Sequence, residues 1–182
     1  MRVAIGFKAH SGWAALVVVG EDNGQLVLVD RRRVELAEEV SGKAPYHAAE
    51  TLPIAEARAL VDRGVKAAHR CAVDEVRAAL KRETKRGNEV VAAAVLTGAP
   101  MPAWTIDEIL AVHFRMHKAE GVLFRDALCK AVEACGLRLV TIPEKEIGKQ
   151  TDPRLTALGK TAGPPWGKDQ KDATFAARSA LP

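Results

Sequence analysis

Residues 2–34 carry the clearest pattern in the chain, and they read RVAIGFKAHSGWAALVVVGEDNGQLVLVDRRRV. Two apolar runs, residues 2–7 and 13–19, are separated by a short turn over residues 8–12. Asn23 and Gly24 follow, and this pair tolerates the positive φ angles of a two-residue type I′ hairpin turn. Leucines and valines then alternate through residues 25–34. The pattern predicts an antiparallel meander of three strands.

Two long helices and two further strands are expected downstream. A helix over 53–86 begins at Pro53 and ends before Gly87, and an apolar strand over 89–96 follows it. Thr105 and Glu108 have the spacing of a capping box, which predicts a helix that runs to about residue 135 and stops at Gly136. A fifth strand is expected over 138–142 and a last helix over 169–180. Residues 35–52 are interpreted as a connection, and 144–168 as irregular with one short helix.

This order of elements resembles the ribonuclease H-like fold, which ribonuclease H, the Holliday-junction resolvases and, in elaborated form, the actin-like ATPases share. The basic, glycine-containing run over 159–163, GKTAG, is similar to a resolvase segment at the same place. The resemblance implies an α/β fold with a mixed five-stranded sheet, in the order 3-2-1-4-5, and helices on both faces. Right-handed crossovers place the fourth strand beside the first.

Composition is that of an ordinary soluble domain. The chain has 182 residues, of which 48% are hydrophobic and 27% charged, so we expect a single domain over 1–182 and exclude disorder and disulfide scaffolds. No apolar run is long enough for a membrane span, and no signal-peptide pattern follows Met1, which favours the cytoplasm. The chain has three cysteines, Cys71, Cys129 and Cys135, and no two of them form a Cys-x-x-Cys pair. They are interpreted as reduced, structural thiols. The net charge of +4 permits an acidic partner.

The nuclease site that the resemblance implies is largely missing. Nucleases of this fold hold two divalent cations with carboxylates from the first strand, the end of the fourth strand and the last helix. Here the first strand has no acidic residue and ends near Lys8, while the strand over 89–96 has only Glu89, at its beginning. The last helix contributes Asp169 and Asp172, which also suit the N-cap and first turn of a helix. We therefore do not expect an intact two-metal site.

The helix over 105–135 carries ionisable residues among its apolar positions. At 100° per residue, His113, His117 and Glu120 fall within roughly 60° of one another, on the arc that also contains Ile109 and Phe124. We therefore expect all three side chains to point toward the core or a cleft. A polar network without chemistry, a ligand or catalytic pocket, and a transition-metal site chelated by the i, i+4 histidines all remain open.

The resemblance places the start of this helix next to the end of the first strand. Lys8, as an anion holder, and Ser11, in the same turn, are then expected near the helix. The acid–base or hydrogen-bonding groups of the candidate pocket are His10, His113, His117 and Glu120. The candidate metal ligands are His113, His117, Glu120, Asp169 and Asp172.

A basic stripe follows one face of the helix over 53–86. Its members are spaced like groups that contact a phosphate backbone: Arg63, Lys66, Arg70, Arg77 and Lys81. Asp62 and Asp74 neutralise part of this stripe, and an ordinary solvated face is the alternative. No partner can be assigned to His47 or His69.

Three functions follow in order of preference. The first is a binding or accessory module for an anionic ligand, such as nucleic acid or a nucleotide, without two-metal nuclease chemistry. The second is an enzyme that acts on a small anionic substrate through the Lys/His/Glu pocket, and the third is a divergent Mg²⁺ nuclease. A divalent metal ion is the one cofactor class that the sequence suggests, and the oligomeric state is left open.

Overall fold

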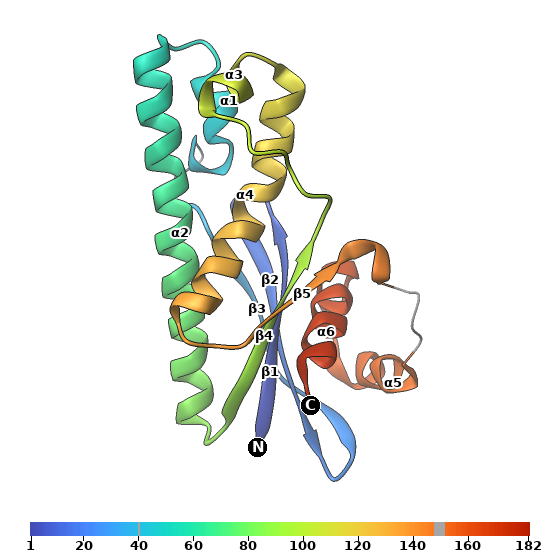
Figure 1. The fold of residues 1–182 in the computed structure, drawn as a ribbon. Helices are drawn as coiled ribbons and strands as arrows, with labels where there is room; N and C mark the ends of the chain where they lie inside the picture. Colours follow the sequence, from blue (N-terminus) through green and yellow to red (C-terminus); the bar gives the residue numbers. More distant parts are fainter. Residues whose placement is uncertain (40, 148–151) are drawn as a thin grey trace.

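Five strands form one mixed sheet in the order β3-β2-β1-β4-β5, as predicted (Figure 1). The computed structural model describes residues 1–39, 41–147 and 152–182. β1 (Arg2–His10), β2 (Trp13–Asp22) and β3 (Gln25–Glu35) are antiparallel to one another. β4 (Glu89–Thr97) lies parallel to β1, and β5 (Leu139–Pro143) lies parallel to β4. The first strand is therefore at the centre of the sheet.

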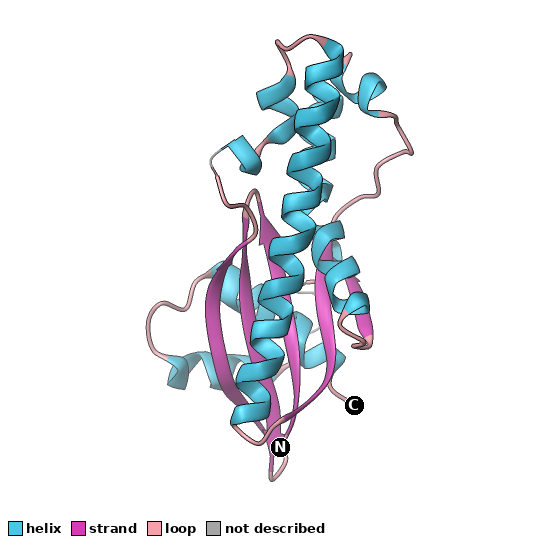
Figure 2. Cartoon of the chain, turned by 90° about the vertical axis from the view of Figure 1, so that its left-hand side faces the viewer, coloured by secondary structure: helices cyan, strands magenta, loops and turns pink. Residues whose placement is uncertain are grey.

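Helices cover both faces of the sheet. α2 (Ile54–Lys85) and α4 (His113–Ala134) lie on one face, while α5 (Pro153–Ala162) and α6 (Lys168–Ala180) lie on the other (Figures 1 and 2). Alternate residues of each strand point to opposite faces. Ile5 and Phe7 accordingly join the core beneath α2 and α4, whereas Ala4 packs in the second core with residues of α6.

The first turn is shorter than predicted, and β1 is longer. Residues 8–12 are expected to form the turn, but β1 continues to His10, which pairs directly with Trp13 of β2. Only Ser11 and Gly12 remain in the turn, where Gly12 has a φ of 79°. Lys8 is consequently a strand residue and is only 8% exposed.

The helix predicted over 105–135 is in fact two helices. The capping box is confirmed, because the Thr105 side chain accepts a hydrogen bond from the Glu108 amide and the Glu108 carboxylate accepts one from the Thr105 amide at 2.8 Å. The helix it begins, α3 (Ile106–Leu110), ends after five residues. Val112 then adopts an extended conformation, with φ −141° and ψ 113°, and α4 begins at His113.

Short helices lie in the segment predicted as a connection, and also in the segment predicted as irregular with one short helix. The segment over 35–52 contains η1 (Ser41–Lys43) and α1 (Pro45–Ala49), and that over 144–168 contains η2 (Glu144–Glu146) and α5. Residues 40 and 148–151 of these segments lie outside the described part of the chain. α1 packs against α2 at a point that needs glycine, because a Cβ on Gly64 would lie 2.6 Å from the Pro45 Cβ.

Among the described residues, no helix has the length and apolar character that crossing a lipid bilayer requires.

Gly6 is the point of closest approach between β1 and α6. A Cβ at this position would lie 2.0 Å from the Ala173 carbonyl oxygen. We expect Gly6→Ala to lower the free energy of unfolding by about 1–3 kcal/mol, since α6 must move off the sheet. Gly121→Ala, where the nearest atom outside the helix backbone lies 3.7 Å away, serves as the control and should be neutral or stabilising by up to about 1 kcal/mol. Urea denaturation of both variants tests this, and equal stabilities would contradict it.

Cys129 is expected to stay protonated in the folded protein. Burial, together with the nearby charges of Asp126 and Glu133, raises the pKa of its thiol from 9.0 to about 11. Only roughly 0.1% is thiolate at pH 8, so alkylation by iodoacetamide should be at least tenfold slower in the native protein than in urea. The folded state retains the proton longer than the unfolded state does, so the thiol's contribution to stability is lost as pH rises from 9.0 toward 11. Equal labelling rates in both states would contradict this assignment.

Candidate functional site

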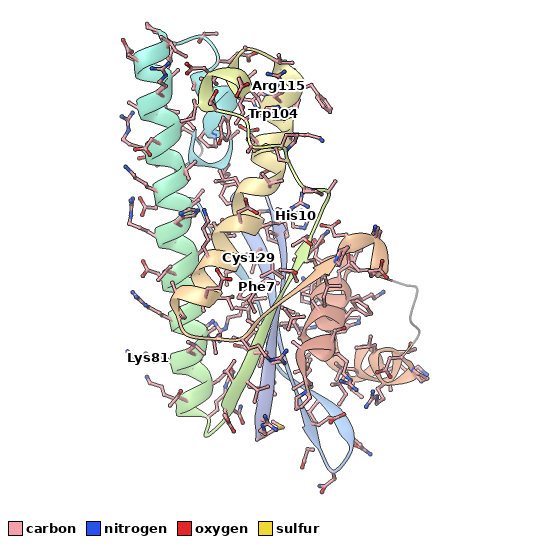
Figure 3. The ribbon with its side chains drawn as sticks, in the orientation of Figure 1. Phe7, His10, Lys81, Trp104, Arg115 and Cys129 are labelled. Atoms are coloured by element: carbon pink, nitrogen blue, oxygen red, sulfur yellow. The ribbon has the colours of Figure 1, made fainter. Side chains whose placement is uncertain are left out.

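The parallel pairing of β1 with β4 brings the ends of both strands beside α4 and η2. A cavity of about 270 Å³, here called the strand-end pocket, opens there. Figure 3 shows His10 at this end of β1, between α4 and α6. The lining residues come from β1, the turn after it, α4 and η2: Lys8, Ala9, His10, Ser11, Glu120, Gly121, Phe124, Arg125 and Glu144.

Three carboxylates, Glu144 of η2 and Asp169 and Asp172 of α6, each have a basic partner. The ammonium nitrogen of Lys8 lies 2.8 Å from Glu144 Oε1. His10 Nε2 lies 2.9 Å from Asp169 Oδ1, and its ring stacks on Trp13 with 4.3 Å between the centroids. Asp172, only 5% exposed, accepts a hydrogen bond of 2.5 Å from Lys168 Nζ. The chain's own basic groups thus engage all three of these carboxylates.

The two aspartates of the last helix occupy different positions from those predicted. Gly167, rather than Asp169, is the N-cap of α6, and Asp169 lies in the first turn. Asp172 is buried one turn further along. The N-cap interpretation is therefore wrong, because the helix begins earlier than residue 169 and leaves both carboxylates free to pair with side chains.

Arg125 is a pocket residue that the sequence did not single out. Its Nε donates a hydrogen bond to the Gly121 carbonyl oxygen at 2.7 Å, within α4. The guanidinium lies over Gly98, just beyond β4, where a Cβ would be only 1.9 Å from Nη1. A glycine after the strand thus makes room for this cation, and the two residues meet only through the tertiary fold.

The predicted inward orientation holds for Glu120 and is wrong for His113 and His117. Glu120 is buried, with 9% exposure, whereas both histidines are exposed. The first turns of α4 lie beyond the strand ends, beside the short helix α1, so no sheet covers them (Figure 1).

His47, for which no partner was assigned, faces Glu120. The Glu120 carboxylate accepts two hydrogen bonds from it: one from the backbone amide at 3.1 Å, and one from ring Nδ1, with the two atoms 2.6 Å apart. His113 Nδ1 lies 3.1 Å from Glu50 Oε1, and His113 Nε2 lies 3.1 Å from His117 Nε2. His47, His113 and His117 are here called the histidine cluster.

The single pocket predicted from the sequence is therefore divided into two neighbouring groups. Lys8, His10, Ser11 and Glu120 line the strand-end pocket, while the other two predicted histidines belong to the histidine cluster. Glu120 belongs to both groups, because it lines the strand-end pocket and its carboxylate is hydrogen-bonded to His47 of the histidine cluster. His47 lay in a segment without helical periodicity, so the sequence carried no signal for it.

The basic stripe lies on the exposed side of α2. All five of its members are exposed, and Figure 3 shows Lys81 directed away from the sheet. Lys66 pairs with Asp62 at 2.6 Å, and Arg58 pairs with Asp107. The exposed charged residues of α2 are seven basic and three acidic: Arg58, Arg63, Lys66, Arg70, Arg77, Lys81, Lys85, Glu56, Asp62 and Asp74.

The Lys8–Glu144 pair can be tested with a double-mutant cycle. Glu144→Gln leaves the buried ammonium without its carboxylate, and we expect the free energy of unfolding to fall by about 1–2 kcal/mol. Lys8→Met in the Glu144→Gln background removes that unpaired charge and should recover most of the loss. Urea denaturation at pH 7 measures Glu144→Gln, Lys8→Met and the double variant against the wild type. A double variant less stable than Glu144→Gln would show that Lys8 has another stabilising partner.

The comparisons with known proteins found likeness in structure alone. No family model and no curated protein sequence matches the chain. The structure of Thermus thermophilus RuvC in complex with a Holliday junction substrate is similar, with 12% sequence identity, coverage of 97% of this chain and 90% of that chain, and a TM-score of 0.52. A second Thermus thermophilus RuvC structure has 13% identity, coverage of 96% and 90%, and a TM-score of 0.49. The first likeness, together with the sheet order, shows that this chain has the ribonuclease H-like fold that its element order predicted.

Proposed function

We propose that this protein is a cytoplasmic nucleic-acid-binding module that does not use the two-metal nuclease mechanism of its fold. The observation that carries this proposal is the buried Lys8 ammonium at the end of β1, 2.8 Å from Glu144. The resemblance implies a metal-binding carboxylate on this strand. The ammonium group of Lys8 repels a divalent cation at this place, and it forms an ion pair with the neighbouring carboxylate of Glu144.

The residues around the strand-end pocket do not fit a pair of Mg²⁺ ions. Such ions require several carboxylate oxygens that are free to ligate them. Here Glu144, Asp169 and Asp172 are held by Lys8, His10 and Lys168 respectively. We accordingly assign no hydrolytic step to this site.

The charge of α2 supports nucleic acid as the ligand. From Arg63 to Lys81 the basic stripe extends about 27 Å, at 1.5 Å per residue. Exposed Lys and Arg side chains in a row bind phosphates by releasing condensed counterions. Because the similar Thermus thermophilus RuvC is in complex with a Holliday junction, four-way junction DNA is the first ligand to test, beside duplex and single-stranded DNA.

Binding through the stripe can be measured by fluorescence anisotropy with labelled DNA between about 50 and 200 mM salt. We expect the double reversal Arg70→Glu/Arg77→Glu to weaken binding more than tenfold and to reduce the slope of log affinity against log salt by about two. The matched control is Lys160→Glu/Lys171→Glu, which makes the same charge change on the opposite helix layer. Equal losses in both double variants, or no binding at about 50 mM salt, would contradict the proposal.

Nuclease activity is tested separately. We expect no incision of junction or duplex DNA with Mg²⁺ or Mn²⁺, because Lys8, His10 and Lys168 engage the three carboxylates. Electrophoresis of end-labelled DNA provides the measurement. Incision that disappears in Asp172→Asn would overturn this part of the proposal and establish a divergent nuclease.

A further inference from the structure

We infer that His47, His113 and His117 form a binding site for a divalent transition-metal ion, and that Zn²⁺ is the ion that fits best. One ring nitrogen from each histidine lies within 4.8 Å of the other two. His113 and His117 are separated by one turn of α4, and His47 reaches them from α1. The site is independent of the proposed nucleic-acid surface on α2.

The spacing of the nitrogens is close to that of a tetrahedral site. Zinc–nitrogen bonds of about 2.0–2.1 Å place neighbouring ligand nitrogens about 3.3 Å apart. The Nε2 atoms of His113 and His117 are 3.1 Å apart, so this pair is already at the required separation. The ring centroids are 4.4–5.1 Å apart, and the rings meet edge to face or tilted rather than stacked. All three ring nitrogens lie within 4.8 Å of one another, so the rings need to draw together only slightly to reach about 3.3 Å around an ion.

Carboxylates orient two of the three rings. Glu120 lies at His47 Nδ1 and Glu50 lies at His113 Nδ1, so in each ring Nε2 is the nitrogen that a carboxylate does not engage. Metal-binding histidines typically make this hydrogen bond to a carboxylate through the ring nitrogen that is not coordinated. Glu120, predicted as a candidate ligand, would thus act as a positioning residue.

The observation that points most directly to a bound ion is the unpaired nitrogen Nε2 of His47. This atom is buried, and it has no hydrogen-bond partner among the described residues. Buried polar atoms of this kind are nearly always paired in folded proteins, and an unpaired one is costly. A metal ion bound between the three rings would satisfy the lone pair without moving Glu120.

The chemistry of the donors selects the ion. Three neutral imidazoles favour Zn²⁺ and its transition-metal neighbours, whereas Mg²⁺ and Ca²⁺ require oxygen ligands. His113 and His117 are exposed, so a fourth coordination position is open to water or to a ligand from solution. His117 also lines a cavity of about 410 Å³ whose charged residues are Lys118, Arg125 and Glu144. The two basic residues suit an anionic fourth ligand, since Glu144 is paired with Lys8.

Zinc binding by the untagged full chain tests this inference. Competition with a chromophoric chelator gives the affinity and stoichiometry, and the visible absorption of bound Co²⁺ reports a tetrahedral site. We expect one ion per chain, a loss of affinity of at least a hundredfold in His113→Ala and in His117→Ala, and wild-type affinity in the matched control His69→Ala. Both ligand variants affect exposed side chains, so circular dichroism should show that they remain folded.

The carboxylate of Glu50, which orients the ring of His113, gives a second readout. Glu50→Gln keeps the size of the side chain and removes its charge, and it should weaken zinc binding by about 10- to 100-fold without changing the stoichiometry. Affinity unchanged in His117→Ala, equal losses in the His69→Ala control, or failure of the wild-type chain to bind Zn²⁺ at micromolar concentrations would each overturn the inference.

Discussion

Parallel pairing of β1 with β4 is the constraint on which the rest of the structure depends. The pairing runs from Arg2 opposite Glu89 to Phe7 opposite Val95, and it requires the chain to leave β3 and return through the long helix α2. Since parallel strands end at the same edge of a sheet, Lys8 and the Gly98–Arg125 contact come together there. The strand-end pocket is therefore a product of topology rather than of any local motif.

The features that the sequence predicted are those encoded by neighbouring residues. Strand alternation, the Asn23–Gly24 turn and the Thr105 capping box all depend on contacts within a few positions, and the structure contains each of them. The short helix α1 is different, because five residues cannot hold a helix in water without tertiary support. Its place is set by Pro45 against Gly64 of α2. No periodicity in residues 35–52 could reveal this contact.

Errors in the predicted site have the same origin. A helical wheel is valid only while the helix is continuous, and the extended residue Val112 separates α3 from α4. A wheel also does not show how far the sheet extends: His113 and His117 share α4 with the buried Phe124, but the first turns of α4 lie beyond the strand ends, where no sheet covers them. Glu120 and His47 are 73 positions apart in sequence, and the pair forms only because α1 folds onto α4. Such long-range partners leave no trace in the local pattern of one chain.

The close approach at Gly6 has a consequence for recognising homologues. Because the Ala173 carbonyl occupies the space of a side chain, any descendant that keeps α6 at this height must keep glycine there, whatever else diverges. Most core positions of the sheet accept exchanges among aliphatic residues. We therefore expect the glycine two positions before the strand-end lysine to tolerate substitution less than the hydrophobic positions around it, which makes it the feature to look for in sequences that keep this packing of α6.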